Sequence, residues 1–217
     1  MTHHKDNATE ALASKSTESE ENDTVSQKTK SETTDESTED SHTDLGFEEE
    51  EFIQEISFSH RDLPYLEYKS ETWLVDENGE KGRPLSYECG VWQLDRNASP
   101  LDAGPGMFPG SEEPAFKDAE AVEHLRNPQE GFDIMANIVH PGGISELYVG
   151  DVQKGRINLH TDMVMRTKGA KEYTAATRMY GWVNGDLLWA WDIAAHGKPL
   201  NTHASAQLKK VYRGDDE

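Results

Sequence analysis

The chain has 217 residues, a formal net charge of −21 and one cysteine, Cys89. A charge this negative opposes binding to nucleic acid and to anionic membranes, and a lone cysteine excludes disulfide frameworks and cysteine-based zinc sites. The sequence shows neither an apolar run long enough to span a bilayer nor a signal-peptide pattern. We therefore expect a cytoplasmic protein that binds neither nucleic acid nor membrane.

Residues 1–44 differ in composition from the rest of the chain. They contain no aromatic residue, and Ser, Thr and Glu dominate, with twelve acidic residues and four lysines. Such a segment buries too little apolar surface to offset the entropy of ordering. We predict a disordered acidic tail over residues 1–44 and a folded domain over residues 45–217. Deleting the tail should leave the thermal stability of the domain nearly unchanged.

Hydrophobic alternation with a period of two recurs from Phe52 to Val211 and predicts strands separated by turns. The clearest hairpin joins YTAATRMYGWV to LLWAWDIAA through Asn184-Gly185. The alternation lapses over residues 96–131, where the segment EPAFKDAEAVEHLRN has the composition of one short helix. We interpret residues 96–131 as an insertion in an all-β domain.

Large aromatic side chains share one face of the predicted strands, as Trp189 and Trp191 do in LLWAWDIAA. This pattern suits a sandwich core or a barrel interior. We favour an antiparallel up-and-down β-barrel with an apolar cavity, which would take a flat or elongated ligand.

Motifs for hydrolases, nucleotide phosphates, dinucleotides and zinc proteases are absent from the sequence. His3 and His4 in the predicted tail make a weak metal site, and a Gly-Lys-Pro turn separates His196 from His203. If Ala204, Ala206 and Leu208 point inward, a straight strand turns His203 outward, whereas a bend at Asn201 and Thr202 would reverse that direction.

Three segments resemble the nitrobindins, a family of haem-binding β-barrels. Residues 168–211 (KGAKEYTAATRMYGWVNGDLLWAWDIAAHGKPLNTHASAQLKKV) are similar to the C-terminal half of the family. Residues 58–94 resemble its second and third strands, and IVHPGGISELYVG at residues 138–150 resembles a further segment. The pattern PLxxHxxAxL is matched by Pro199, Leu200, His203, Ala206 and Leu208.

The resemblance implies that His203 is the proximal ligand of a ferric haem b. One nitrogen of a neutral imidazole would bind the iron, and the N–H of the other nitrogen would be oriented by a hydrogen-bond acceptor. Trp189, Trp191 and Ile193 would form part of the cavity wall. The implied activity is isomerisation of peroxynitrite to nitrate, with nitric oxide binding at the same iron.

The chain departs from the family at two places. The Gly-x-Trp-x-Gly-x-Gly-x-Gly strand that opens the family barrel is absent, so a barrel strand is expected to be missing. Ser86 stands where some relatives carry a distal histidine, so no distal ligand is assigned. An open barrel favours a second hypothesis, a member without haem that binds an apolar ligand such as a lipid or serves as an interaction module.

Overall fold

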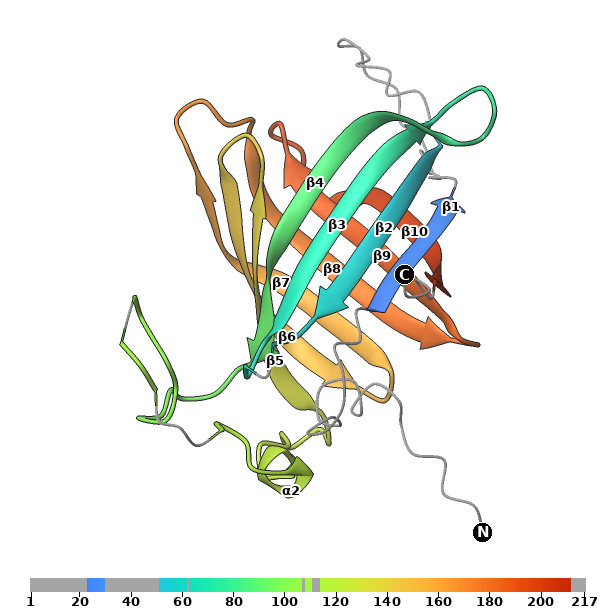
Figure 1. Ribbon diagram of the computed structural model, residues 1–217. Helices are drawn as coiled ribbons and strands as arrows, with labels where there is room; N and C mark the ends of the chain where they lie inside the picture. The colour runs from blue at the N-terminus through green and yellow to red at the C-terminus, as the bar shows by residue number, and fades with distance from the viewer. Residues whose placement is uncertain (1–22, 30–50, 62, 107, 111–113, 212–217) are drawn as a thin grey trace.

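A computed structural model describes residues 23–29, 51–61, 63–106, 108–110 and 114–211 of the chain. These ranges contain ten strands and one short helix (Figure 1). The elements are β1 (Asp23–Thr29), β2 (Phe52–Ser59), β3 (Leu66–Val75), β4 (Lys81–Leu94), α2 (Ala119–Glu123), β5 (Phe132–His140), β6 (Ile144–Gln153), β7 (Arg156–Arg166), β8 (Tyr173–Val183), β9 (Asp186–Ala195) and β10 (Asn201–Val211). Within these ranges, no helix has the length and apolar character needed to cross a membrane.

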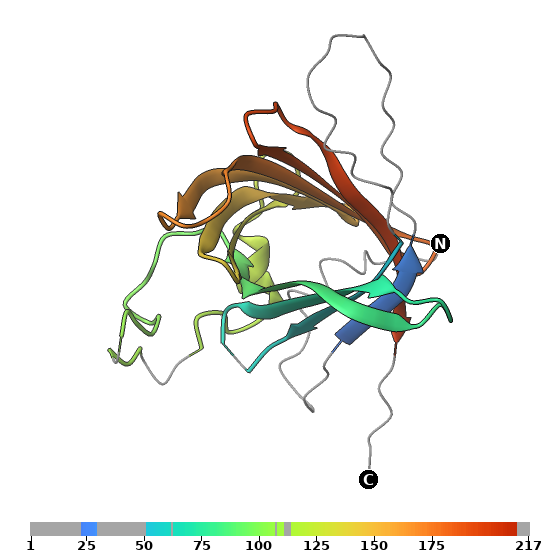
Figure 2. The ribbon, with the colours of Figure 1, turned by 90° about the horizontal axis from the view of Figure 1, so that it is seen from above.

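The strands form one closed antiparallel barrel. Each strand from β2 to β10 pairs with the strands next to it in sequence, and β1 pairs with both β2 and β10. Seen from above, the strands surround a common interior (Figure 2). The predicted up-and-down β-barrel is therefore confirmed, and the sandwich alternative is excluded.

Strand β1 corrects two expectations drawn from the sequence. Disorder was predicted for all of residues 1–44, but residues 23–29 form a strand. A missing barrel strand was also predicted, but β1 fills the gap between β2 and β10. The physical reason is that strand edges on both sides offer unpaired backbone N–H and C=O groups, which a strand can satisfy even without apolar side chains. The other residues of the predicted tail lie outside the described residues.

The apolar side chains of the predicted alternation point inward and fill the barrel interior. In β5 the buried side chains are those of Phe132, Ile134, Ala136 and Ile138, each at most 3% exposed. Burying a large aliphatic or aromatic side chain contributes about 1.5–3 kcal/mol to folding. Aromatic residues of other strands join this core, namely Tyr68, Trp92, Tyr148, Tyr173, Tyr180 and Trp189.

The predicted hairpin and the predicted short helix are both present. Asn184 and Gly185 adopt positive φ angles of 54° and 91° between β8 and β9, as a two-residue hairpin turn requires. Helix α2 lies within the predicted insertion, and Asp118 caps it by accepting a hydrogen bond from the Ala121 amide at 2.8 Å.

The insertion between β4 and β5 lies at one end of the barrel. Because the strands alternate in direction, this connection and the turn between β9 and β10 lie at opposite ends. Helix α2 accordingly lies below the barrel in Figure 1. The insertion is therefore placed away from the start of β10, where His203 lies.

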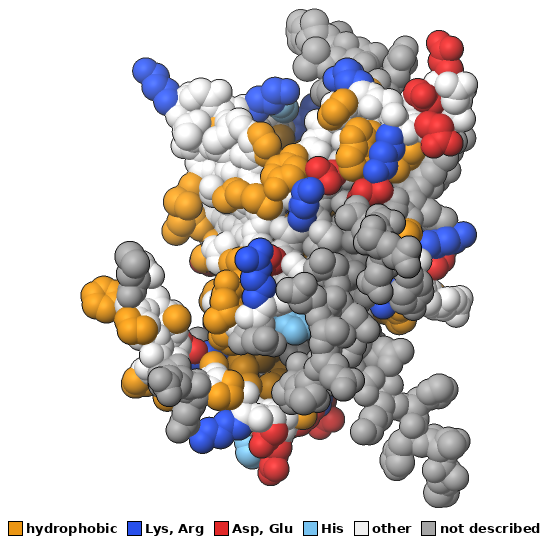
Figure 3. All heavy atoms as spheres, viewed as in Figure 1, with side chains coloured by type: hydrophobic (Ala, Val, Ile, Leu, Met, Phe, Trp, Pro, Cys, Tyr) orange, Lys and Arg blue, Asp and Glu red, His pale blue; other side chains and the backbone are white. Residues whose placement is uncertain are grey.

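The outer surface mixes charged and hydrophobic side chains. Figure 3 shows hydrophobic groups interspersed with Lys and Arg on one face of the molecule. The large hydrophobic residues that remain exposed include Met163, Met165, Met179 and Trp182.

Candidate functional site

His203 lies at an irregularity in β10. Thr202 is opposite Asp192 of β9 and Ala204 is opposite Trp191, so His203 is an extra residue without a partner in the register. Such a bulge re-aims a side chain relative to a straight strand. The bend needed to reverse the outward direction of His203 is thus present, between Thr202 and Ala204 rather than at Asn201 and Thr202.

The ring of His203 contacts the indole of Trp191. Their ring centroids are 5.2 Å apart and the planes meet at 79°, an edge-to-face arrangement. Trp191 is partly buried and packs against the barrel core. His203 therefore stands at the start of β10 with one side of its ring against an interior-facing tryptophan.

His203 as a whole is exposed, yet the protein that surrounds its ring lowers its pKa through desolvation. The contact with Trp191 covers one part of the ring and so contributes to this desolvation. A lowered pKa favours the neutral imidazole at neutral pH, and the neutral imidazole is the form that ligates a metal.

The second partner expected for His203 is not found in the described part of the chain. The resemblance implied an acceptor that orients the other ring nitrogen, but no described residue hydrogen-bonds to the His203 ring. Of the three predicted wall residues, Trp189 is 6% exposed, and Trp191 and Ile193 are partly buried against the core.

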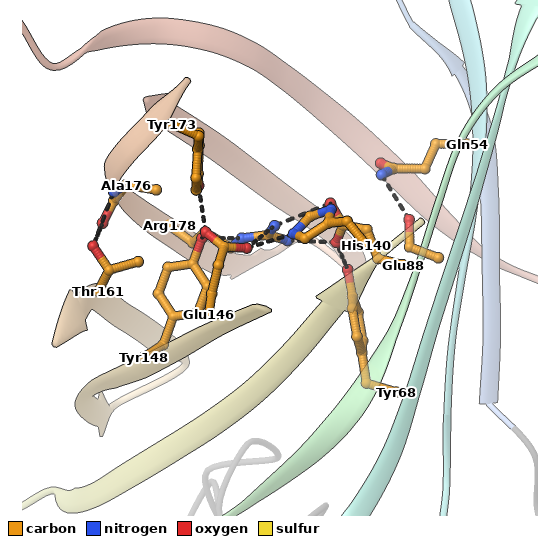
Figure 4. A network of polar contacts seen from close by, with 11 residues as sticks. Gln54, Tyr68, Glu88, His140, Glu146, Tyr148, Thr161, Tyr173, Ala176 and Arg178 are labelled. Atoms are coloured by element: carbon orange, nitrogen blue, oxygen red, sulfur yellow. Dashed lines mark hydrogen bonds and ion pairs between the residues drawn. The ribbon is translucent and has the colours of Figure 1, made fainter. Parts of the chain in front are cut away.

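A buried ion pair joins Arg178 of β8 to Glu88 of β4 (Figure 4). Arg178 donates from Nη1 and Nη2 to the two carboxylate oxygens of Glu88 at 2.8 and 3.0 Å. Tyr68 donates to the same carboxylate at 3.0 Å. Burial alone would raise the pKa of Glu88, but the charge of Arg178 lowers it, so both partners remain ionised.

A second carboxylate, that of Glu146 in β6, extends this network. It lies 3.7 Å from Arg178, and it accepts hydrogen bonds from Tyr148 at 2.6 Å and from Tyr173. His140 approaches it at 2.5 Å. Burial is the main reason that the pKa values of Tyr148 and Tyr173 are raised, so both hydroxyls stay protonated donors. The interior of the barrel thus holds charged groups as well as aromatic ones.

The network and the tryptophan are in direct contact. The guanidinium of Arg178 lies 4.5 Å from the centroid of the Trp191 ring. The imidazole of His140 lies nearly parallel to the indole, at 6.2 Å and 7°. A continuous set of contacts therefore runs from the buried ion pair through Trp191 to His203.

This network was not predicted from the sequence, although the alternation of inward and outward side chains within the strands pointed to one of its members. Arg178 has the same parity in β8 as Ala176 and Tyr180, which are buried. A charged side chain on the inward face of a strand requires a partner. That partner, Glu88, is 90 positions away in sequence, and the sequence alone does not identify it.

The other candidate residues lie apart from this site or outside the described residues. Ser86 is exposed in β4 opposite Thr72, and Cys89 is half-buried in the same strand. His196 is exposed in the turn before β10, with a positive φ of 53°. His3 and His4 lie outside the described residues.

Comparison with known proteins identifies the family of this domain. Residues 34–210 match the family model of the THAP4-like, heme-binding beta-barrel domain. A protein of Renibacterium salmoninarum named peroxynitrite isomerase is 58% identical over 164 residues, which is 76% of this chain and 78% of that protein. A protein of the same name from Paenarthrobacter aurescens is 55% identical over 162 residues, covering 75% of this chain and 81% of that protein.

A solved structure shows the same fold. The crystal structure of Rv2717c from M. tuberculosis superposes with a TM-score of 0.57 at 21% sequence identity, covering 88% of this chain and 91% of that one. The family match spans most of the barrel. Each alignment with the two relatives covers more than two thirds of this chain and more than two thirds of the relative. The chain therefore belongs to the family of THAP4-like, heme-binding β-barrel domains.

Proposed function

We propose that this protein binds ferric haem b through His203 and isomerises peroxynitrite to nitrate, with nitric oxide as a further ligand of the iron. The observation that carries the proposal is the placement of His203. His203 is exposed, its pKa is lowered by partial burial, and no described residue forms a hydrogen bond with its ring nitrogens. Support also comes from the name peroxynitrite isomerase borne by the two relatives.

The residues around His203 fit a haem. Haem is held by an axial nitrogen ligand together with apolar contacts to the porphyrin. His203 supplies the nitrogen, and Trp191 supplies an aromatic surface beside it. The indole of Trp191 packs against the hydrophobic core, and its buried Nε1 has no hydrogen-bond partner among the described residues.

When bound, ferric haem would supply the iron at which the O–O bond of peroxynitrite is broken and its atoms rearrange to nitrate. His203 would hold the group by donating its lone pair, and a neutral ring is required for this. Trp191, which contacts the ring, would limit access of water on that side. Peroxynitrite and nitrate have the same atoms and charge, so the reaction needs no oxidant or reductant.

The closed barrel removes the reason for the alternative function. Binding of a lipid or another apolar molecule without haem was suggested by a missing strand, and β1 fills that position. Native mass spectrometry of protein purified from cells nevertheless distinguishes the two, since a retained fatty acid and no haem would support the alternative.

The test compares His203→Ala with the wild-type protein after reconstitution with ferric haem. We expect the variant to lose haem affinity at least about tenfold, to shift the Soret band and to lose peroxynitrite isomerisation, because the axial ligand is gone. His160→Ala is the matched control, since His160 is also an exposed strand histidine. An unchanged spectrum for His203→Ala would overturn the assignment.

A further inference from the structure

Metal-binding histidines are usually oriented by a hydrogen bond from the second ring nitrogen to a carboxylate or carbonyl. In the described part of this chain, His203 has no such hydrogen bond. Its backbone is also less constrained than that of a regular strand residue, because the bulge leaves it without a partner in β9. Another contact must therefore orient the ring.

The contact present is the one with Trp191. It joins the two rings edge to face at 5.2 Å, a geometry favoured by the quadrupoles of aromatic rings. Trp191 is opposite Ala204 in the register, directly beside the bulge. The strand pairing thus brings the indole next to the imidazole.

Trp191 is suited to orient a neighbour because it is itself held in place. Arg178 lies 4.5 Å from the centroid of its ring, and His140 stacks on the indole at 6.2 Å. Arg178 is in turn fixed by Glu88 at 2.8 and 3.0 Å and by the hydroxyl of Tyr148 at 3.0 Å. Because Arg178 is only 3% exposed, little solvent competes for these contacts.

We infer that Trp191 is a positioning residue that orients the imidazole of His203 by ring contact, in the role that a hydrogen-bond acceptor has at most metal-binding histidines. The inference rests on the proposed function, since it assumes that His203 is the haem ligand. The buried pair of Arg178 and Glu88 then acts on the ligand through Trp191 and does not touch it.

The test replaces Trp191 by Leu and by Phe in the full chain. Trp191→Leu removes the ring contact and should speed haem dissociation about tenfold, as does the loss of other contacts that orient a metal ligand. It should also shift the iron–histidine stretching band in the resonance Raman spectrum of the ferrous form. Trp191→Phe retains an aromatic ring and should restore most of both properties.

Trp92→Leu is the matched control. Trp92 of β4 is a core tryptophan that is 4% exposed and contacts Tyr180 edge to face at 5.5 Å rather than His203. Its replacement should lower folding stability as Trp191→Leu does but leave the iron–histidine band unchanged. If Trp191→Leu and Trp92→Leu give the same band and the same rate of haem loss, the inference is overturned.

A measurement on the haem-free protein separates this inference from the proposed function. The ring protons of His203, assigned from their loss in His203→Ala, should shift in Trp191→Leu because the indole ring current is removed. They should not shift in Trp92→Leu, since Trp92 contacts Tyr180 instead. If His203→Ala leaves the haem spectrum unchanged, the proposed function fails. If His203→Ala changes that spectrum but Trp191→Leu changes neither the spectrum nor the proton shifts, only the positioning role fails.

Discussion

At the scale of single residues, Arg178 and Glu88 form an ion pair that is buried in the barrel. Arg178 is 3% exposed and Glu88 5%. Removing one member of such a pair leaves an uncompensated buried charge, which costs about 3–5 kcal/mol. The pair therefore constrains which substitutions the interior tolerates.

Glu88→Gln should lower the free energy of unfolding by about 3–5 kcal/mol at pH 7. The pKa of Glu88 is lowered in the folded state, so its contribution is complete above the pKa of the unfolded chain, about 4.3, and is lost as the pH falls through the folded value. The difference between wild type and variant in urea unfolding should thus shrink below about pH 4. A difference that stays constant down to pH 3 would contradict this account.

Glu71→Gln is the control for that experiment. Glu71 is a strand residue paired with Lys69 at 2.8 Å, but both side chains are largely exposed. Surface pairs of this kind contribute about 0–1 kcal/mol. We therefore expect little change in the free energy of unfolding at any pH.

At the scale of elements, β1 closes the barrel by pairing with both β2 and β10. It pairs with β2 over seven residues, from Asp23 opposite Phe58 to Thr29 opposite Phe52, and with β10 over three. The family match begins at residue 34, so this strand is supplied by sequence that precedes the shared domain. Removing it would leave β2 and β10 with unpaired backbone groups.

Deletion of residues 1–29 should therefore destabilise the domain, whereas deletion of residues 1–22 should not. With each lost backbone hydrogen bond costing about 0.5–1.5 kcal/mol, we expect roughly 3 kcal/mol or more and a fall in Tm of about 6–12 °C. Differential scanning calorimetry of the two truncated proteins measures this. Equal Tm values would restore the interpretation that the whole tail is structurally dispensable.

At the scale of the whole molecule, haem binding and folding are linked. A group that binds only the folded barrel adds to its stability by mass action. His203 on β10 and Trp191 on β9 are close to each other only when these strands are paired. The unfolded chain therefore offers no equivalent site.

Haem should accordingly raise the Tm of the wild-type protein more than that of His203→Ala. At a free haem concentration one hundred times the dissociation constant, the gain is about 2.7 kcal/mol, which corresponds to roughly 5–10 °C for a domain of this size. Thermal melts at increasing haem concentration measure the gain, and extraction of haem should reverse it. An equal rise in both proteins would point to haem held without His203.

Much of the architecture could be read from the sequence because its signals are local. Alternation with a period of two predicts strands, and Asn184-Gly185 predicts the hairpin that the structure contains. The short helix and its insertion followed from the lapse of that alternation. His203 was singled out through the family resemblance, and its role remains a proposal.

What the tertiary structure alone decided depends on contacts between distant segments. Strand β1 lacked every local signal, because backbone pairing to the edges of β2 and β10 does not require apolar side chains. Glu88 and Arg178 meet across the barrel, and Trp191 meets His203 because a bulge re-aims one side chain. Local patterns are set by neighbours along the chain, whereas closure of the barrel, charge pairing and ring orientation are set by neighbours in space.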